Sequence, residues 1–143
     1  MKKSLYLISL LMLLSACERY VFTFNDTPVY QPSALFSDYT IADPALSRCV
    51  TQHIADLKII AATELERLEC PHLKITHLGG LDPFSGISIL NLADNDLTSL
   101  AALYSLQQLR HLNLDTNPRL DCNEAGHFEK QSVQLTLPVH CKN

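Results

Sequence analysis

The sequence predicts an α/β protein in which short coils stack into a small solenoid, with a parallel sheet held between two caps. Three observations predict this fold. Apolar residues recur with a period of 22 residues between positions 65 and 121. A helix-start signal precedes that region, and a stretch of alternating apolar and polar residues follows it. The chain has 143 residues, enough for one modest domain.

Residues 1–16 are predicted to be an export signal that is removed from the mature protein. Lys2 and Lys3 form a basic start, and the apolar run 5–14 is shorter than the roughly 20 residues that a membrane-spanning helix needs. The run ends in Leu14-Ser15-Ala16-Cys17, where a cysteine directly follows two small residues. The remaining choice is therefore between an ordinary secretory signal with a chance cysteine and a lipoprotein signal.

The four residues that end at Cys17 resemble the bacterial lipobox. The resemblance implies that a diacylglycerol is transferred to the thiol of Cys17, that the chain is cleaved before it, and that the new amine is acylated. The protein would then be held in a membrane of the cell envelope by its lipid. Glu18 stands where an aspartate would favour retention in the inner membrane, so the resemblance implies the outer membrane of a Gram-negative bacterium.

Charge weighs against nucleic acid as a partner. The formal net charge is −4, and loss of the signal with its two lysines makes it −6 (−4 minus 2). A nucleic-acid-binding protein usually presents a basic face. An acidic body also gains nothing from anionic lipid, so acyl chains must supply the anchoring.

Residues 17–40 are predicted to be a tether between the lipid and a domain that spans 41–143. They carry Thr-Pro and Gln-Pro steps without a sustained period, although the stretch 20–24 could instead pair as a strand. The domain begins with an N-terminal cap, 41–64. Asp43-Pro44 is a helix-start signal, and we expect an amphipathic helix from Asp43 to about Asp56 that covers the first repeat.

The repeats occupy residues 65–121. One copy reads Ile87-x-x-Leu90-x-Leu92-x-x-Asn95-x-Leu97, and 22 residues later the chain reads Leu109-x-x-Leu112-x-Leu114-x-x-Asn117. A partial copy, Leu65-x-x-Leu68-x-Cys70, begins 22 residues before Ile87 and forms the first of the three repeats. Alternating leucines indicate a strand rather than a helix. Each asparagine is expected to bond backbone groups of a turn inside the stack, and leucines spaced by three predict a 3₁₀-like arm.

This pattern resembles the leucine-rich-repeat family, in particular its short 22-residue bacterial class found in internalin-like proteins. The resemblance implies a right-handed solenoid with its parallel sheet on the concave side. It covers the chain from about Asp43 onward. The first repeat has Leu73 where the family has asparagine, so the asparagine ladder should begin at the second repeat. Fold-level resemblance does not carry adhesion or another function over.

Residues 122–143 are predicted to cap the other end. Apolar residues alternate with polar ones there and suggest a strand that finishes the sheet, namely Val133, Leu135, Leu137 and Val139. Four cysteines besides Cys17 suggest two disulfides in an exported protein, with three pairings possible. Because Cys70 replaces an inward leucine of the first repeat and Cys49 lies on the core face of the cap helix, we expect the pairs Cys49–Cys70 and Cys122–Cys141. The competing interpretation leaves Cys49 and Cys70 reduced in the core.

The outward face of the sheet is the predicted binding surface for a protein or a glycan. Its candidate residues are Arg67, Glu69, Ile89, Asn91, His111, Asn113 and Asp115. The alternatives are a solvated face without a ligand and a structural role in the envelope. His111 and Asp115 are about 13 Å apart along one strand, too far for an acid–base pair. The histidines and cysteines of the sequence do not have the spacing of a metal or redox site, and the sequence has no enzyme motif. We expect no enzyme activity, no cofactor and no metal, and we expect a monomeric chain.

Overall fold

The computed structural model describes residues 23–24, 27–28 and 33–142. The predicted export signal and Cys17 lie outside the described residues. The chain divides into two compact units, Met1–Ser33 and Ala34–Asn143. In the first unit, strand β1 (Thr23–Phe24) pairs antiparallel with strand β2 (Thr27–Pro28). Only the last two residues of the possible strand 20–24 belong to the described part.

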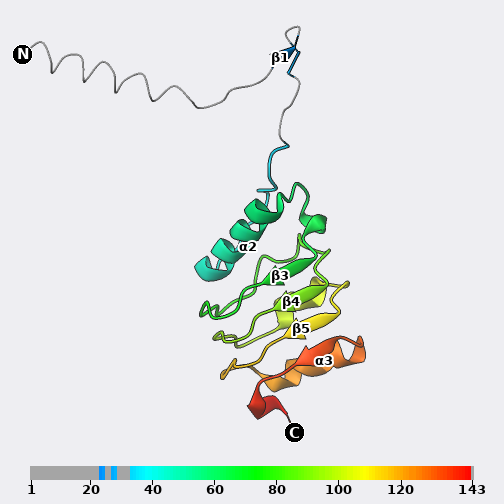
Figure 1. The fold of residues 1–143 in the computed structure, drawn as a ribbon. Helices are drawn as coiled ribbons and strands as arrows, with labels where there is room; N and C mark the ends of the chain where they lie inside the picture. The colour runs from blue at the N-terminus through cyan, green and yellow to red at the C-terminus, as the bar shows by residue number, and fades with distance from the viewer. Residues whose placement is uncertain (1–22, 25–26, 29–32, 143) are drawn as a thin grey trace, which may run out of the picture. The chain divides into compact units, whose positions relative to one another are not determined.

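A four-stranded parallel sheet organises the second unit (Figure 1). Its strands are β3 (Arg67–Glu69), β4 (Ile89–Asn91), β5 (His111–Asn113) and β6 (Gln134–Thr136). They lie side by side in chain order. Residues 22 apart pair between the first three strands, and residues 23 apart pair between β5 and β6. The predicted α/β class and small parallel sheet are confirmed, and the sheet is open at both ends.

Helix α2 (Pro44–Leu57) begins where the sequence predicts it. Asp43 caps the helix, because one carboxylate oxygen accepts hydrogen bonds from the backbone N–H groups of Ala45 and Leu46. Its other oxygen accepts from the backbone and hydroxyl of Thr76 and from the backbone of His77. The same buried side chain therefore starts the helix and ties it to the first repeat. Within the described residues, no helix is both long and apolar enough to span a membrane.

The folded unit begins before the predicted boundary at residue 41. Phe36 donates its backbone N–H to the carbonyl of Ile59 at 2.9 Å. The rings of Phe36 and Tyr39 stand edge-on to buried Phe84, with centroids 5.8 and 5.3 Å apart. Residues 34–40, which we expected to belong to the tether, thus pack against the domain. Aromatic pairs stabilise a fold beyond the effect of the area that they bury. This packing was not predicted because residues 34–40 show no periodic pattern of apolar side chains.

One continuous core runs through the repeats, built from side chains that recur at the 22-residue period. The strands contribute Leu68, Leu90 and Leu112, all buried. Leucines spaced by three were predicted to form a 3₁₀-like arm, and the second repeat has one, η2 (Ala101–Ser105). Further short 3₁₀ turns are η1 (Ala62–Glu64), η3 (Cys122–Glu124) and η4 (Val139–Cys141).

Two buried asparagines hold neighbouring repeats together. The amide nitrogen of Asn95 donates to the carbonyls of Cys70 and Leu92, and its oxygen accepts from the backbone of Ile75. Asn117 makes the corresponding bonds in the next repeat, where its amide nitrogen donates to the carbonyls of Leu92 and Leu114. Each asparagine therefore bonds a carbonyl of its own repeat and one of the repeat before it. Backbone groups that would otherwise be buried without partners are satisfied in this way.

The C-terminal cap differs from the prediction in two respects. A helix that we did not predict, α3 (Ala125–Lys130), buries Phe128 and covers the last repeat. The alternating stretch forms a strand only over β6, and Val139, expected to point inward, is 79% exposed in η4. Pro138 explains the early end of the strand, because proline has no N–H to donate to a sheet and fixes its own φ.

One disulfide bond joins the N-terminal cap to the first repeat, and a second closes the C-terminal cap on itself. Cys49 of α2 is bonded to Cys70, and Cys122 is bonded to Cys141. These are the two pairs expected from the sequence, and in this structure Cys49 and Cys70 are not the reduced core residues of the competing interpretation. The bonded residues are 21 and 19 apart in the sequence, so each bond closes a short loop at one end of the core.

Candidate binding surface

The parallel register places the outward side chains of the sheet in two straight rows. One row crosses the strands at their starts and the other at their ends. The first row contains Arg67, Ile89, His111 and Gln134, and the second contains Glu69, Asn91, Asn113 and Thr136. Because neighbouring strands lie about 4.8 Å apart, each row presents its four side chains at a regular spacing.

Six of the seven residues predicted for this surface lie in the two rows. The seventh, Asp115, lies past the end of β5 and lines a different hollow with Pro118 and Pro138. The rows also contain Gln134 and Thr136, which our sequence interpretation did not include. The alternation of apolar residues around them was the available signal, since a residue between two inward side chains of a strand points outward.

Two asparagines of the surface are held in fixed orientations. The side-chain oxygen of Asn91 accepts from the backbone N–H of Ala93, and that of Asn113 accepts from Asp115, both at 3.1 Å. A backbone N–H can only donate, so the oxygen must face it and the amide nitrogen must face the other way. Each half-buried asparagine thus keeps its NH₂ group available at the surface. The two groups repeat from β4 to β5 at the spacing of the strands.

A shallow hollow of about 220 Å³ lies over these strands. Its polar lining includes Glu69, both asparagines and His111, and it extends to Gln134 and Thr136 of β6. Arg67 and Glu69 form an ion pair of 3.1 Å at one side. Their side chains are more than 45% exposed, and an exposed pair of this kind adds little stability. The hollow itself provides hydrogen-bond donors, the amides of Asn91 and Asn113, and has charged groups at one side. Such a surface can hold an extended polar segment.

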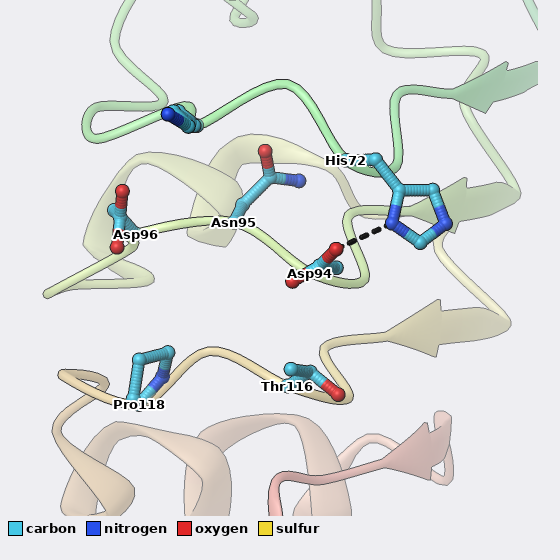
Figure 2. A pocket seen from close by; sticks show the side chains of 7 residues that line it. His72, Asp94, Asn95, Asp96, Thr116 and Pro118 are labelled. Atoms are coloured by element: carbon cyan, nitrogen blue, oxygen red, sulfur yellow. Dashed lines mark hydrogen bonds and ion pairs between the residues drawn. The ribbon is translucent and has the colours of Figure 1, made fainter.

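A second hollow of about 260 Å³ lies beside the turns that follow the strands, and Figure 2 shows its lining. His72, Asp94 and Thr116 occur at the 22-residue interval, and each has a positive φ, between 54° and 60°. This is the left-handed region, which costs energy in residues other than glycine. The imidazole of His72 and the carboxylate of Asp94 lie 2.5 Å apart, as the dashed line in Figure 2 marks. Both side chains are more than half exposed, so water screens this pair.

No protein-family model matches the chain, and no curated protein matches it either. The assignment of a function therefore depends on the geometry of the described residues. Of the two hollows, the one over the sheet has polar groups whose directions are set by backbone hydrogen bonds. We take it as the candidate binding surface.

One group of candidate metal ligands lies in the C-terminal cap, within the described part of the chain. The ligand atoms of Cys122, His140 and Cys141 lie within 4.8 Å of one another. Both sulfurs are bonded to each other, which leaves the imidazole as the single available ligand. The Nε2 atom of the His140 imidazole forms a 3.2 Å hydrogen bond with the carbonyl of Leu120. We assign a structural role to this group, at the end of the C-terminal cap.

Proposed function

We propose that this protein is a non-catalytic lipoprotein of the bacterial cell envelope that recognises a protein or a glycan through the outward face of its sheet. In this proposal the repeats form a right-handed leucine-rich-repeat solenoid, and the lipid on Cys17 anchors it, in the outer membrane of a Gram-negative bacterium. The 22-residue period and the matching strand register support the solenoid. The partner is a molecule that approaches the face over β4 and β5.

The oriented amides of Asn91 and Asn113 carry the proposal. Surface asparagines normally have freedom to rotate, and ordering them on binding costs conformational entropy. Here the backbone of Ala93 and Asp115 has already fixed them. Their NH₂ groups suit an extended partner that offers acceptor oxygens, such as peptide carbonyls or sugar hydroxyls. His111 and Glu69 line the same hollow and would add charged or polar contacts.

The sharpest test reverses the outward group while keeping the turn. In Asn91→Asp with Asn113→Asp, each carboxylate can still accept from the backbone N–H, but an acceptor replaces each outward donor. A photo-crosslinking residue at His111 captures the partner in living cells. We expect the double variant to lose the captured species and a charge-matched control, Gln107→Glu with Gln108→Glu, to retain it. Both glutamines are exposed between η2 and β5. Unchanged capture by the double variant would contradict the proposed surface.

The anchor has its own test. Cys17→Ser removes the thiol that accepts the diacylglycerol, so we expect an uncleaved or soluble chain without acyl label. A variant that still partitions into membranes and still takes up the label would remove lipidation at Cys17 from the proposal.

A structural envelope lipoprotein without a ligand site is the second candidate. The observation in its favour is the small size of the face, four strands of three residues each, against the roughly 800 Å² per partner of a standard interface. If the crosslinker at His111 captures nothing while loss of Cys17 alters the envelope, this second function is the better description.

A further inference from the structure

Several exposed apolar side chains belong to segments that meet at one end of the folded unit. Among the described residues, five large hydrophobic side chains are exposed: Leu35, Leu57, Ile60, Leu73 and Val139. Single exposed leucines are common on soluble proteins and need no explanation. Three of these five, however, belong to neighbouring segments. The backbone bond from Phe36 to Ile59 places Leu35 beside Ile60, and Leu57 ends α2 three residues earlier. We call Leu35, Leu57 and Ile60 the proximal patch.

The proximal patch lies where the chain enters the folded unit. Figure 1 shows the first described residues of this unit and the end of α2 together at one end, with the C-terminus at the opposite end. The predicted anchor, Cys17, is only 17 residues before Ala34, counting 17–33. Seventeen residues span at most about 56–61 Å, the length of a fully extended chain. The anchor therefore keeps this end near the bilayer.

We propose that the proximal patch rests on the lipid surface that holds the anchor, so that the repeats project away from the membrane. This inference depends on the lipidation of Cys17 in the proposed function. Tethering raises the local concentration of lipid around the patch to the millimolar range, and weak contacts then suffice for binding. Three half-exposed apolar side chains are a suitable partner for such a surface, whereas they are too small an area for a stable protein dimer.

The charges around the patch define the kind of lipid surface. Lys58 stands between Leu57 and Ile60, but Asp56 and Glu64 lie close in sequence, and the mature body is acidic. Glu64 is already engaged, because its carboxylate accepts from the backbone N–H of Ile60 at 3.0 Å. The negative charges around the patch would repel anionic headgroups more strongly than Lys58 attracts them. The contact is therefore apolar, with a zwitterionic surface such as phosphatidylethanolamine, and should change little with salt.

A photo-crosslinker detects the contact directly. A benzophenone side chain replaces Leu57 in the full lipidated chain, and in a second protein it replaces Val139, which is at least as exposed. Both are placed in vesicles of phosphatidylethanolamine and phosphatidylcholine. We expect lipid adducts at position 57 to exceed those at position 139 by about tenfold or more, because the tether concentrates lipid at the end of the unit that carries position 57, and the C-terminus lies at the opposite end. Equal adduct yields at the two positions, or adducts at 57 to a second copy of the chain, would overturn the inference.

A second pair of variants tests the side chains themselves. With the crosslinker at exposed Ala61, Leu57→Asn and Ile60→Asn together should lower lipid adducts by about fivefold or more, since the apolar contact is removed. The matched control, Leu73→Asn with Val139→Asn, should leave them unchanged within about twofold. Circular dichroism verifies that both proteins are folded. Equal losses in the two double variants would also overturn the inference.

The experiment separates failure of the inference from failure of the proposed function. A chain that carries acyl label and partitions into vesicles, but gives no excess of adducts at position 57, refutes the proximal patch and leaves the anchor intact. A chain purified from membranes that carries no acyl label on Cys17 refutes the lipoprotein proposal, and the inference about the patch fails with it.

Discussion

Replacing Asn95 by alanine should destabilise the protein far more than replacing Asn91, although both asparagines belong to the same repeat. Asn95 is 3% exposed, and its amide bonds groups of three segments. For the carbonyl of Cys70 and the N–H of Ile75, this amide is the hydrogen-bond partner that the described residues provide. The carbonyl of Leu92 keeps a second donor, the amide of Asn117, at 3.0 Å. Asn95→Ala therefore leaves two buried groups without a partner.

The magnitude follows from those two groups. A buried polar group that loses its partner costs about 1–3 kcal/mol, so the loss of partners for two groups in Asn95→Ala should lower the free energy of unfolding by about 2–6 kcal/mol. Asn91→Ala removes one hydrogen bond, to a partly exposed N–H, and should cost about 0.5–1 kcal/mol. Urea unfolding with the disulfides intact measures both values, and an unchanged m-value would show that the unfolded states are comparable. If the two variants lose equal stability, the inter-repeat role of Asn95 is wrong.

Three further predictions concern the caps and the close approaches between segments. Burial raises the pKa of Asp43, but its hydrogen bonds outweigh this effect and hold the pKa below the usual value. The stability that Asp43 contributes should therefore be complete above about pH 4 and disappear as the pH falls further. In Asp43→Asn the midpoint of urea unfolding should depend less on pH in that range. Joint replacement of Cys122 and Cys141 by serine should cost about 3 kcal/mol, measured by thermal unfolding against the parent protein, and an unchanged Tm would contradict this loop-closure estimate. A Cβ at Gly86 would lie 2.0 Å from a backbone oxygen, so Gly86→Ala should cost more than about 2 kcal/mol, whereas Gly126→Ala, which meets open space, should not destabilise α3.

The repeated part of the fold could be predicted because its signal is a constant spacing of apolar residues along the sequence. It does not depend on the preference of single residues for a helix or a strand. Leu68, Leu90 and Leu112 pair across the sheet at the constant spacing that the sequence shows. The strands themselves are three residues long, too short for alternation alone to identify them. The start of α2 was equally visible, because Asp43 and Pro44 are each favoured at the position that they occupy.

The C-terminal cap and part of the site were less visible for physical reasons. Helix α3 has six residues and includes Gly126, so neither its length nor its composition predicts a helix. The step from β5 to β6 is 23 residues, which hides Gln134 and Thr136 from a search at a period of 22. The hollow beside the turns depends on left-handed backbone at residues such as Thr116, a conformation that β-branched residues rarely adopt and that propensities do not suggest.

The first repeat offers a last prediction, because it lacks the ladder asparagine. Asn95 and Asn117 each donate to a carbonyl of the preceding repeat, and no repeat precedes the first. The turn of the first repeat is bonded by Asn95, whose oxygen accepts from the backbone N–H groups of Leu73 and Ile75. Asp43 of the cap accepts from the two residues that follow, Thr76 and His77. An asparagine at position 73 would have no earlier strand to bind, so Leu73→Asn should change the free energy of unfolding by no more than about 0.5 kcal/mol. Urea unfolding of this variant beside Asn117→Ala provides the comparison. A stabilisation above about 1 kcal/mol would mean that the ladder acts within each repeat and not between neighbours.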